Sequence, residues 1–208
     1  ENLFHTLHAE EKALLKLAML LHDAGKGRKR DHHHVGASLF KPFAKKLSFS
    51  PELIEMGETL ILHHTLMSKV AQREDLHNEK VILKFVSYFK TKTLLDMMYI
   101  LTYADMNGVG KGIYNSFNAK LIKMLYLQSL KALKHTEIID ETAKRIKKEQ
   151  TLKKHPLFLS LSKSQQNKIL MIPSNLLFLR YSPQKIISIS KKAFKTDSYT
   201  YEIYNEDH

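Results

Sequence analysis

The chain has 208 residues and no Cys, and its formal net charge is +12. This length can bury a hydrophobic core without covalent staples, as one large domain or one domain with an appendage. The lack of Cys excludes disulfides, thiolate catalysis and Cys-ligated zinc or iron–sulfur sites, and favours a reducing, cytoplasmic location. No apolar run reaches the roughly 18 residues of a membrane span, so we expect no membrane partner.

The positive charge suits an anionic partner such as a nucleotide phosphate, a nucleic acid or an acidic protein. The densest basic run covers residues 144–154, where Glu149 dilutes it and no aromatic side chain is present to stack on a base. We therefore interpret this run as a solvated face and regard nucleic acid as an unlikely partner.

The composition favours an all-α fold, because Gly and Pro are few and Leu, Lys, Ile and Met are plentiful. All Gly residues lie between Gly25 and Gly112, and the chain beyond about residue 135 is basic and interrupted by proline. We expect a chemical domain at residues 1–135 and a helical extension over residues 136–208 that leads toward a further domain.

Hydrophobic periodicity predicts the helices in chain order. The first, over residues 10–22, is apolar on nearly every side and is therefore expected to be buried, with Gly25 and Gly27 ending it. Ser50 and Pro51 can cap and start another helix. The other expected helices cover residues 36–47, 51–69, 79–90, 94–106, 116–134 and 137–153. Near the end, Pro183 starts a short helix, and residues 199–204 alternate as a strand would.

Polar side chains stand at the ends of the two apolar helices. His22 and Asp23 close the first, and Asp105 lies near the end of the second, in phase with its apolar residues. A buried carboxylate is costly unless it is paired or binds a cation. Both His63 and His64 have apolar neighbours, so helical phase alone does not choose between them.

Three consecutive histidines, His32, His33 and His34, follow the glycine-containing loop. Taken singly, each of these polar residues has an ordinary explanation, as a core histidine, a helix cap or an adventitious metal binder. Together they supply ligand types for Mn, Mg, Fe or Zn on helices that one bundle can bring together. The other histidines have no such context, and we expect them at the surface.

The motifs resemble those of a known family. Residues 21–27, Leu-His-Asp-Ala-Gly-Lys-Gly, resemble the centre of the HD-domain metal phosphohydrolases. Segments 31–37, 64–75 and 101–121 are similar, in order, to the HD domain of the bifunctional PII uridylyltransferase/uridylyl-removing enzymes. Segment 172–183 is similar to the linker before the ACT domains of those enzymes, so the resemblance covers nearly the whole chain.

The resemblance implies a metal-ligand set of His22, Asp23, His32, His64 and Asp105. These residues would hold one or two divalent ions, Mn or Mg before Fe or Zn, with Asp23 able to bridge two ions. The family pattern selects His64 over His63.

The same resemblance selects His32 among the three consecutive histidines and leaves His33 and His34 as bystanders. It also gives Asp23 and Lys26 catalytic roles. Lys26 and Arg73 match basic positions that face the substrate phosphate.

One departure concerns the first metal histidine of HD domains, which lies on the helix before the doublet helix. His5 and His8 are the upstream candidates here, and His8 precedes His22 by 14 residues, about 20 Å along a helix. We therefore expect that histidine, and a nucleotidyltransferase domain, upstream of Glu1. A first metal position would then lack one ligand in this fragment, which could leave it inactive.

The implied activity is metal-dependent removal of UMP from the uridylylated PII signal protein in nitrogen regulation, with glutamine as effector of the full-length enzyme. One alternative is an HD phosphohydrolase acting on free nucleotides such as a dNTP or a guanosine alarmone. Another is a non-catalytic regulatory module that binds metal or glutamine.

Overall fold

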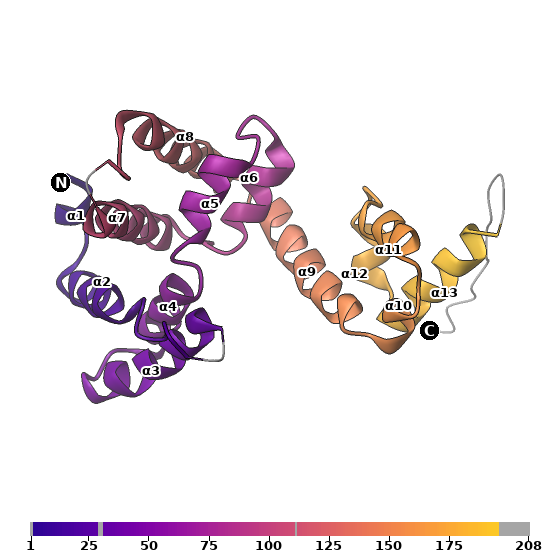
Figure 1. Cartoon of the computed structure of the whole chain (residues 1–208), viewed down its shortest axis with the longest axis horizontal. Coiled ribbons are helices and arrows are strands. Elements are labelled where there is room, and N and C mark those ends of the chain that lie inside the picture. The colour runs from indigo at the N-terminus through magenta and orange to yellow at the C-terminus, as the bar shows by residue number, and fades with distance from the viewer. Residues whose placement is uncertain (1, 29–30, 111, 196–208) are drawn as a thin grey trace. The chain divides into compact units, whose positions relative to one another are not determined.

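The computed structural model describes residues 2–28, 31–110 and 112–195. Within these ranges every regular element is a helix, which confirms the predicted all-α class. The chain divides into two compact units, Glu1–Ile139 and Asp140–His208 (Figure 1).

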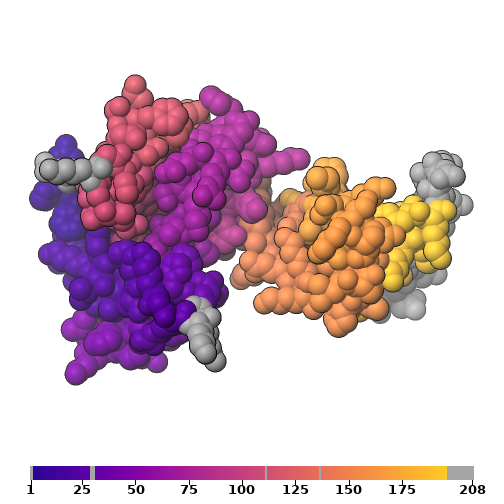
Figure 2. Space-filling model, viewed as in Figure 1, coloured from indigo at the N-terminus to yellow at the C-terminus, as the bar shows by residue number. Residues whose placement is uncertain are grey.

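The first unit contains eight helices and the beginning of a ninth within the described residues. They are α1 (Asn2–His5), α2 (Ala9–Leu21), α3 (His32–Lys46), α4 (Pro51–Leu62), α5 (Leu66–Arg73), α6 (Glu79–Val86), α7 (Lys92–Val109), α8 (Ser116–Ala132) and α9 (Thr136–Lys153). Figure 2 shows that side chains fill the space between these ribbons.

Helices α2, α3 and α4 pack against one another at one side of the first unit. Their contact is close because Gly57 on α4 lies directly under the ring of Phe40 on α3, where a Cβ atom would overlap the ring. The fully buried Leu14 of α2 and Leu60 of α4 belong to the same core. This packing fixes the end of α2 beside the start of α3.

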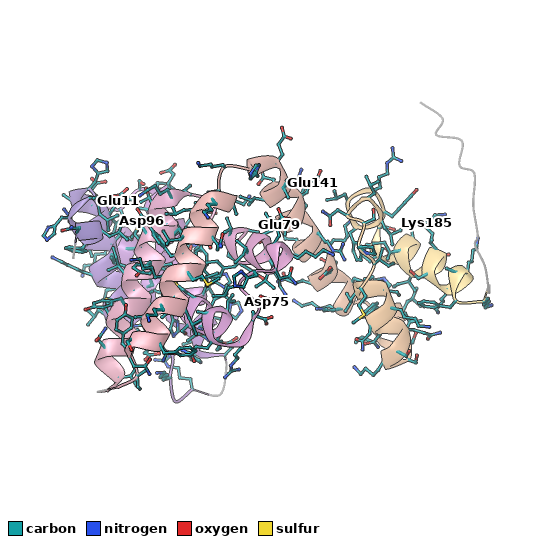
Figure 3. The ribbon with its side chains drawn as sticks, turned by 90° about the horizontal axis from the view of Figure 1, so that it is seen from above. Glu11, Asp75, Glu79, Asp96, Glu141 and Lys185 are labelled. Atoms are coloured by element: carbon teal, nitrogen blue, oxygen red, sulfur yellow. The ribbon has the colours of Figure 1, made fainter. Side chains whose placement is uncertain are left out.

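Helix α7 supplies the centre of the first unit's core and contacts α1, α2, α4, α5 and α8. Its buried Asp96 accepts a hydrogen bond from the hydroxyl of Tyr126 at 2.7 Å and lies 2.6 Å from the ammonium of Lys92. Figure 3 shows Asp96 among the helices of this unit. Asp96 is therefore a buried carboxylate with a full set of protein partners.

The second unit is built from the rest of α9 with α10 (Pro156–Leu159), α11 (Lys163–Leu170), α12 (Leu176–Arg180) and α13 (Pro183–Ala193). Its core contains seven buried residues, Leu152, Phe158, Leu161, Ile169, Phe178, Ile186 and Ile187. The expected irregular stretch after Pro173 and the short helix that begins at Pro183 are both present.

Arg145 departs from the expectation that the basic run is a solvated face. Its guanidinium donates to the carbonyl oxygens of Leu170, at the end of α11, at 3.2 Å and of Ile172 at 2.7 Å, and to those of the two residues that follow Ile172. It also contacts Glu149 and lies 4.3 Å from the centroid of the Phe178 ring. Arg145 thus holds the loop between α11 and α12 to α9.

Two helix boundaries differ from the sequence prediction for identifiable reasons. Helix α3 begins at His32 rather than Gly36, because the carboxylate of Asp31 caps it by accepting from the His33 amide at 3.0 Å. The single helix predicted over residues 51–69 is two helices, since α4 ends at Leu62 and α5 begins at Leu66. The predicted strand at residues 199–204 lies outside the described residues.

Candidate metal centre

The end of α2 places His22 and Asp23 at the start of a tight loop. His22 caps α2, and its Nδ1 lies 2.7 Å from the carbonyl oxygen of Met19, one turn earlier. A Cβ at Gly25 would overlap the carbonyl oxygen of His32, so only glycine lets this loop pass so close to the start of α3. The loop thereby brings the histidine–aspartate doublet next to α3.

His64 stands in the break between α4 and α5 and is almost completely buried, with 2% of its side chain exposed. Its Nδ1 lies 2.8 Å from the carbonyl oxygen of Ile61, and its Nε2 lies 3.6 Å from Oδ1 of Asp23. In an uninterrupted helix the Ile61 carbonyl would be bonded within the helix. The break therefore gives His64 its orientation.

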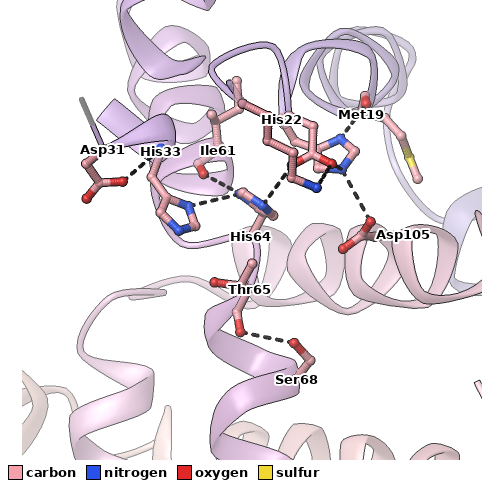
Figure 4. A network of polar contacts seen from close by, with 11 residues as sticks. Met19, His22, Asp31, His33, Ile61, His64, Thr65, Ser68 and Asp105 are labelled. Carbon is pink, nitrogen blue, oxygen red and sulfur yellow. Dashed lines mark hydrogen bonds and ion pairs between the residues drawn. The ribbon is translucent and has the colours of Figure 1, made fainter. Parts of the chain in front are cut away.

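Asp105 approaches the doublet from α7, as Figure 4 shows. Its Oδ1 lies 3.3 Å from Nε2 of His22. Nε2 of His22 also lies 3.3 Å from a carboxylate oxygen of Asp23. Four predicted residues from three separate stretches of the sequence thus surround one small volume.

The hydrogen bonds indicate which atoms face this volume. In both His22 and His64 the Nδ1–H donates to a backbone carbonyl, so that Nε2 carries the free lone pair. Nε2 of His22 and Oδ1 of Asp23 are buried and lack a hydrogen-bond partner of good geometry among the described residues. Ligand atoms of His22, Asp23 and His64 lie within 4.8 Å of one another.

These residues fit a divalent metal ion. Leaving a buried polar atom without a partner costs about 1–3 kcal/mol, and a cation would satisfy both orphaned atoms at once. Metal-binding histidines regularly donate their other ring nitrogen to a carbonyl or carboxylate, and His22 and His64 both do so here.

The electrostatics of the cluster make cation binding sensitive to pH. The Asp105 carboxylate raises the pKa of the His22 imidazole, and His22 in turn lowers the pKa of Asp105. Burial lowers the pKa of His64, which favours its neutral form. Because the raised pKa makes a proton a stronger competitor for Nε2 of His22, cation affinity is expected to fall at low pH.

The first turn of α3 adds His32 and His33 beside His64. Their two rings stack with centroids 3.9 Å apart, and the centroid of His32 lies 5.8 Å from that of His64. Nδ1 of His33 is 3.3 Å from Nδ1 of His64. Ligand atoms of these three histidines also lie within 4.8 Å of one another. The resemblance had set His33 aside as a bystander, whereas the structure brings it into contact with His64.

The two predicted phosphate-binding cations occupy different places. The ammonium of Lys26 contacts the Asp23 carboxylate and is otherwise largely exposed, at the solvent side of the cluster. Arg73 is exposed at the last residue of α5, which begins beside His64 and extends about 10 Å to Arg73. The structure therefore brings Lys26, but not Arg73, to the cluster. His8 lies at the opposite end of α2 from His22.

Comparison with known families covers the part of the chain that holds the histidines of the cluster. Residues 2–91, less than half of the chain, match the family model described as the HD domain. Asp105 lies beyond the matched residues. No helix within residues 2–28, 31–110 and 112–195 combines the length and apolarity that a membrane span needs.

Curated relatives extend the match beyond the family model. The chain is 40% identical over 120 residues to a bifunctional uridylyltransferase/uridylyl-removing enzyme of Bordetella avium, covering 58% of this chain and 14% of that protein. Enzymes of the same name from Rhodopseudomonas palustris and Cereibacter sphaeroides are 37% and 35% identical over 127 and 122 residues. These alignments cover 61% and 59% of the chain and 14% and 13% of the two enzymes. No solved structure matches the chain.

Proposed function

We propose that this chain is the uridylyl-removing hydrolase part of a bifunctional enzyme and releases UMP from a uridylylated PII signal protein. The single observation that carries the proposal is the pair of orphaned ligand atoms, Nε2 of His22 and Oδ1 of Asp23, inside a cluster completed by His64 and Asp105. The matched relatives support the substrate, since their names include uridylyl removal.

His22, Asp23, His64 and Asp105 would hold a divalent ion, Mn or Mg, with His32 as a further ligand. When bound, the ion makes hydroxide available from water at neutral pH and polarises the phosphoryl group. Asp23 lies between the other ligands, because one of its oxygens is 3.3 Å from His22 and the other 3.6 Å from His64. It is therefore the residue best placed to bridge two ions.

Lys26 supplies positive charge at the mouth of the cluster, where the non-bridging oxygens of a phosphodiester would lie. Hydrolysis forms a bond between the water oxygen and phosphorus and breaks the bond from phosphorus to the tyrosine oxygen. The leaving phenolate has a parent pKa of about 10 and departs without a strong general acid. None is therefore assigned among the residues of the cluster.

The test compares two substrates in the presence of Mn²⁺. UMP release from uridylylated PII, without hydrolysis of free nucleotides, supports the proposal, and hydrolysis of free nucleotides alone contradicts it. Asp23→Asn should abolish the activity, whereas a purely regulatory module would show no activity to lose. A role in nitrogen regulation, with glutamine as effector, requires the same measurements on the full-length enzyme.

A further inference from the structure

The second unit, Asp140–His208, carries half of the net charge of the chain, with thirteen Lys and Arg against seven Asp and Glu. Residues 140–195 contain thirteen Lys and Arg but only three Asp and Glu, in a chain of net charge +12. This excess lies outside the unit that contains the metal cluster. It therefore needs an explanation other than the chemistry of that cluster.

Part of this charge surrounds a pocket of about 360 Å³ within the second unit. One wall is a single face of α9, where Lys144, Lys147 and Lys148 follow helical spacing, with Thr151 one turn further on. The opposite wall is apolar and consists of Phe178, Leu179 and Pro183. No ion pair to these three lysines is found among the described residues of the chain.

The lining favours an acidic polypeptide over a nucleotide. Phe178, the aromatic residue of the pocket, is fully buried, and the guanidinium of Arg145 covers one face of its ring. It therefore offers no face on which a base could stack. No carboxylate or amide side chain lines the pocket to recognise a base edge, whereas the partly exposed Leu179 and Pro183 beside three ammonium groups suit an apolar side chain flanked by carboxylates.

We propose that this pocket docks an acidic segment of the protein substrate, while the phosphodiester is hydrolysed at the metal cluster. The inference rests on the proposed function for the identity of that protein. Its consequence is that substrate affinity depends on a surface that does not take part in the reaction.

The test measures binding and hydrolysis separately. We expect the triple variant K144E/K147E/K148E to raise the Kd for uridylylated PII at least 10-fold when binding is measured without metal. The matched control K163E/K168E/K191E makes the same charge change on α11 and α13, outside the pocket, and should leave Kd within 2-fold. The corresponding Lys→Gln triple variant should give an intermediate Kd, and circular dichroism checks that each variant stays helical.

Equal loss of binding in both charge-reversed variants, or no loss in either, would overturn the docking site. Failure of the wild-type chain to bind uridylylated PII would overturn it as well. Hydrolysis of the small phosphodiester bis(p-nitrophenyl) phosphate with Mn²⁺ tests the metal cluster independently, and none of the lysine variants should change it. The two proposals can therefore fail separately.

A second inference comes from the metal cluster itself and concerns His33. The contact between His33 and His64 joins their Nδ1 atoms at 3.3 Å, on the edge of His64 that faces away from Asp23. Nδ1 of His64 already donates to the carbonyl of Ile61, so a cation cannot use that nitrogen. The contact is therefore not a pair of ligands around one ion.

We infer that His33 is a positioning residue that holds the His64 ring with its Nε2 toward the cluster. His33 is itself fixed by the cap at Asp31, which accepts from its amide, and by stacking on His32. This inference also rests on the proposed metal centre. Removal of a partner behind a metal-binding histidine typically lowers metal affinity by about 10–100-fold.

Metal titration gives a test that does not depend on activity. We expect His33→Ala to weaken Mn²⁺ binding by about 10–100-fold with unchanged stoichiometry, and to alter the visible spectrum of bound Co²⁺. His33→Asn, which keeps a hydrogen-bonding group, should recover part of the affinity, and the neighbouring His34→Ala should match wild type. Equal affinities for the His33→Ala and His34→Ala variants would contradict the inference, as would a loss of stoichiometry, which would make His33 a ligand. If the wild-type chain binds no metal, the proposed metal centre fails as well.

Discussion

Helix α7 contains two carboxylates, at its two ends, that look alike in sequence but differ in their surroundings. Asp96 is buried and has both a tyrosine hydroxyl and an ammonium group as partners. Asp105 faces the imidazole of His22, beside two buried ligand atoms for which the described part of the chain offers no hydrogen bond of good geometry. A carboxylate on an apolar helix thus indicates a site only when its neighbours are left unsatisfied by the protein.

The largest expected effect separates these two carboxylates by function. Asp105→Asn should lower Mn²⁺ affinity and phosphodiester hydrolysis by at least about 100-fold, because it removes the negative charge that faces the cation. Its free energy of unfolding should change by less than about 1 kcal/mol, since the pair with His22 is partly exposed. Isothermal titration and thermal unfolding measure the two quantities. Wild-type metal affinity in this variant would remove Asp105 from the site.

The next test concerns Gly25 in the loop between α2 and α3, which places His22 and Asp23 opposite Asp105. Gly25→Ala should cost about 1–3 kcal/mol of stability and weaken metal binding, because the added Cβ overlaps the carbonyl of His32 and pushes α3 away. Gly108→Ala is the control, since a Cβ there meets nothing within 4 Å in a helix. The control should be neutral or stabilising by up to about 1 kcal/mol. Equal unfolding midpoints for the two variants would show that the close approach at Gly25 is unimportant.

Asp96→Asn should show the reverse of the Asp105 variant. It weakens the contact with Lys92 and leaves a buried amide opposite the hydroxyl of Tyr126, at a cost of about 1–3 kcal/mol in stability. Metal affinity should stay within 2-fold of wild type. Denaturant unfolding and metal titration on the same preparation check both expectations, and a large loss of metal binding in a folded variant would make Asp96 part of the site.

The smallest effect concerns Tyr126 and is seen in the pH dependence of stability. Burial and the neighbouring Asp96 raise the pKa of the Tyr126 hydroxyl above its usual value near 10. Because the unfolded chain then loses this proton at lower pH than the folded chain, stability should fall as the pH rises above about 10. Tyr126→Phe should cost about 1 kcal/mol at pH 7 and make this alkaline decline shallower. Parallel pH profiles for the two proteins would contradict this assignment.

Most of the helical pattern could be predicted from the sequence, because apolar periodicity, caps and prolines act locally. Ser50 and Pro51 begin α4 as expected, and Pro183 begins α13. The interruption at residues 63–65 could not be predicted, since the apolar Leu60 and Met67 on either side keep the seven-residue spacing of one continuous helix. That break is what turns His64 toward Asp23.

In the candidate site, too, some features could be predicted from the sequence and others could not. The ligand types, the histidine–aspartate doublet and the family resemblance are properties of the sequence alone. The neighbours of each residue are not: Arg145 is used to hold a loop, Arg73 lies far along α5, and His33 contacts His64. Local patterns determine which residues are buried, whereas the atoms that satisfy them come from segments distant in the chain. Only the tertiary structure therefore decides which buried polar atoms remain open to a ligand.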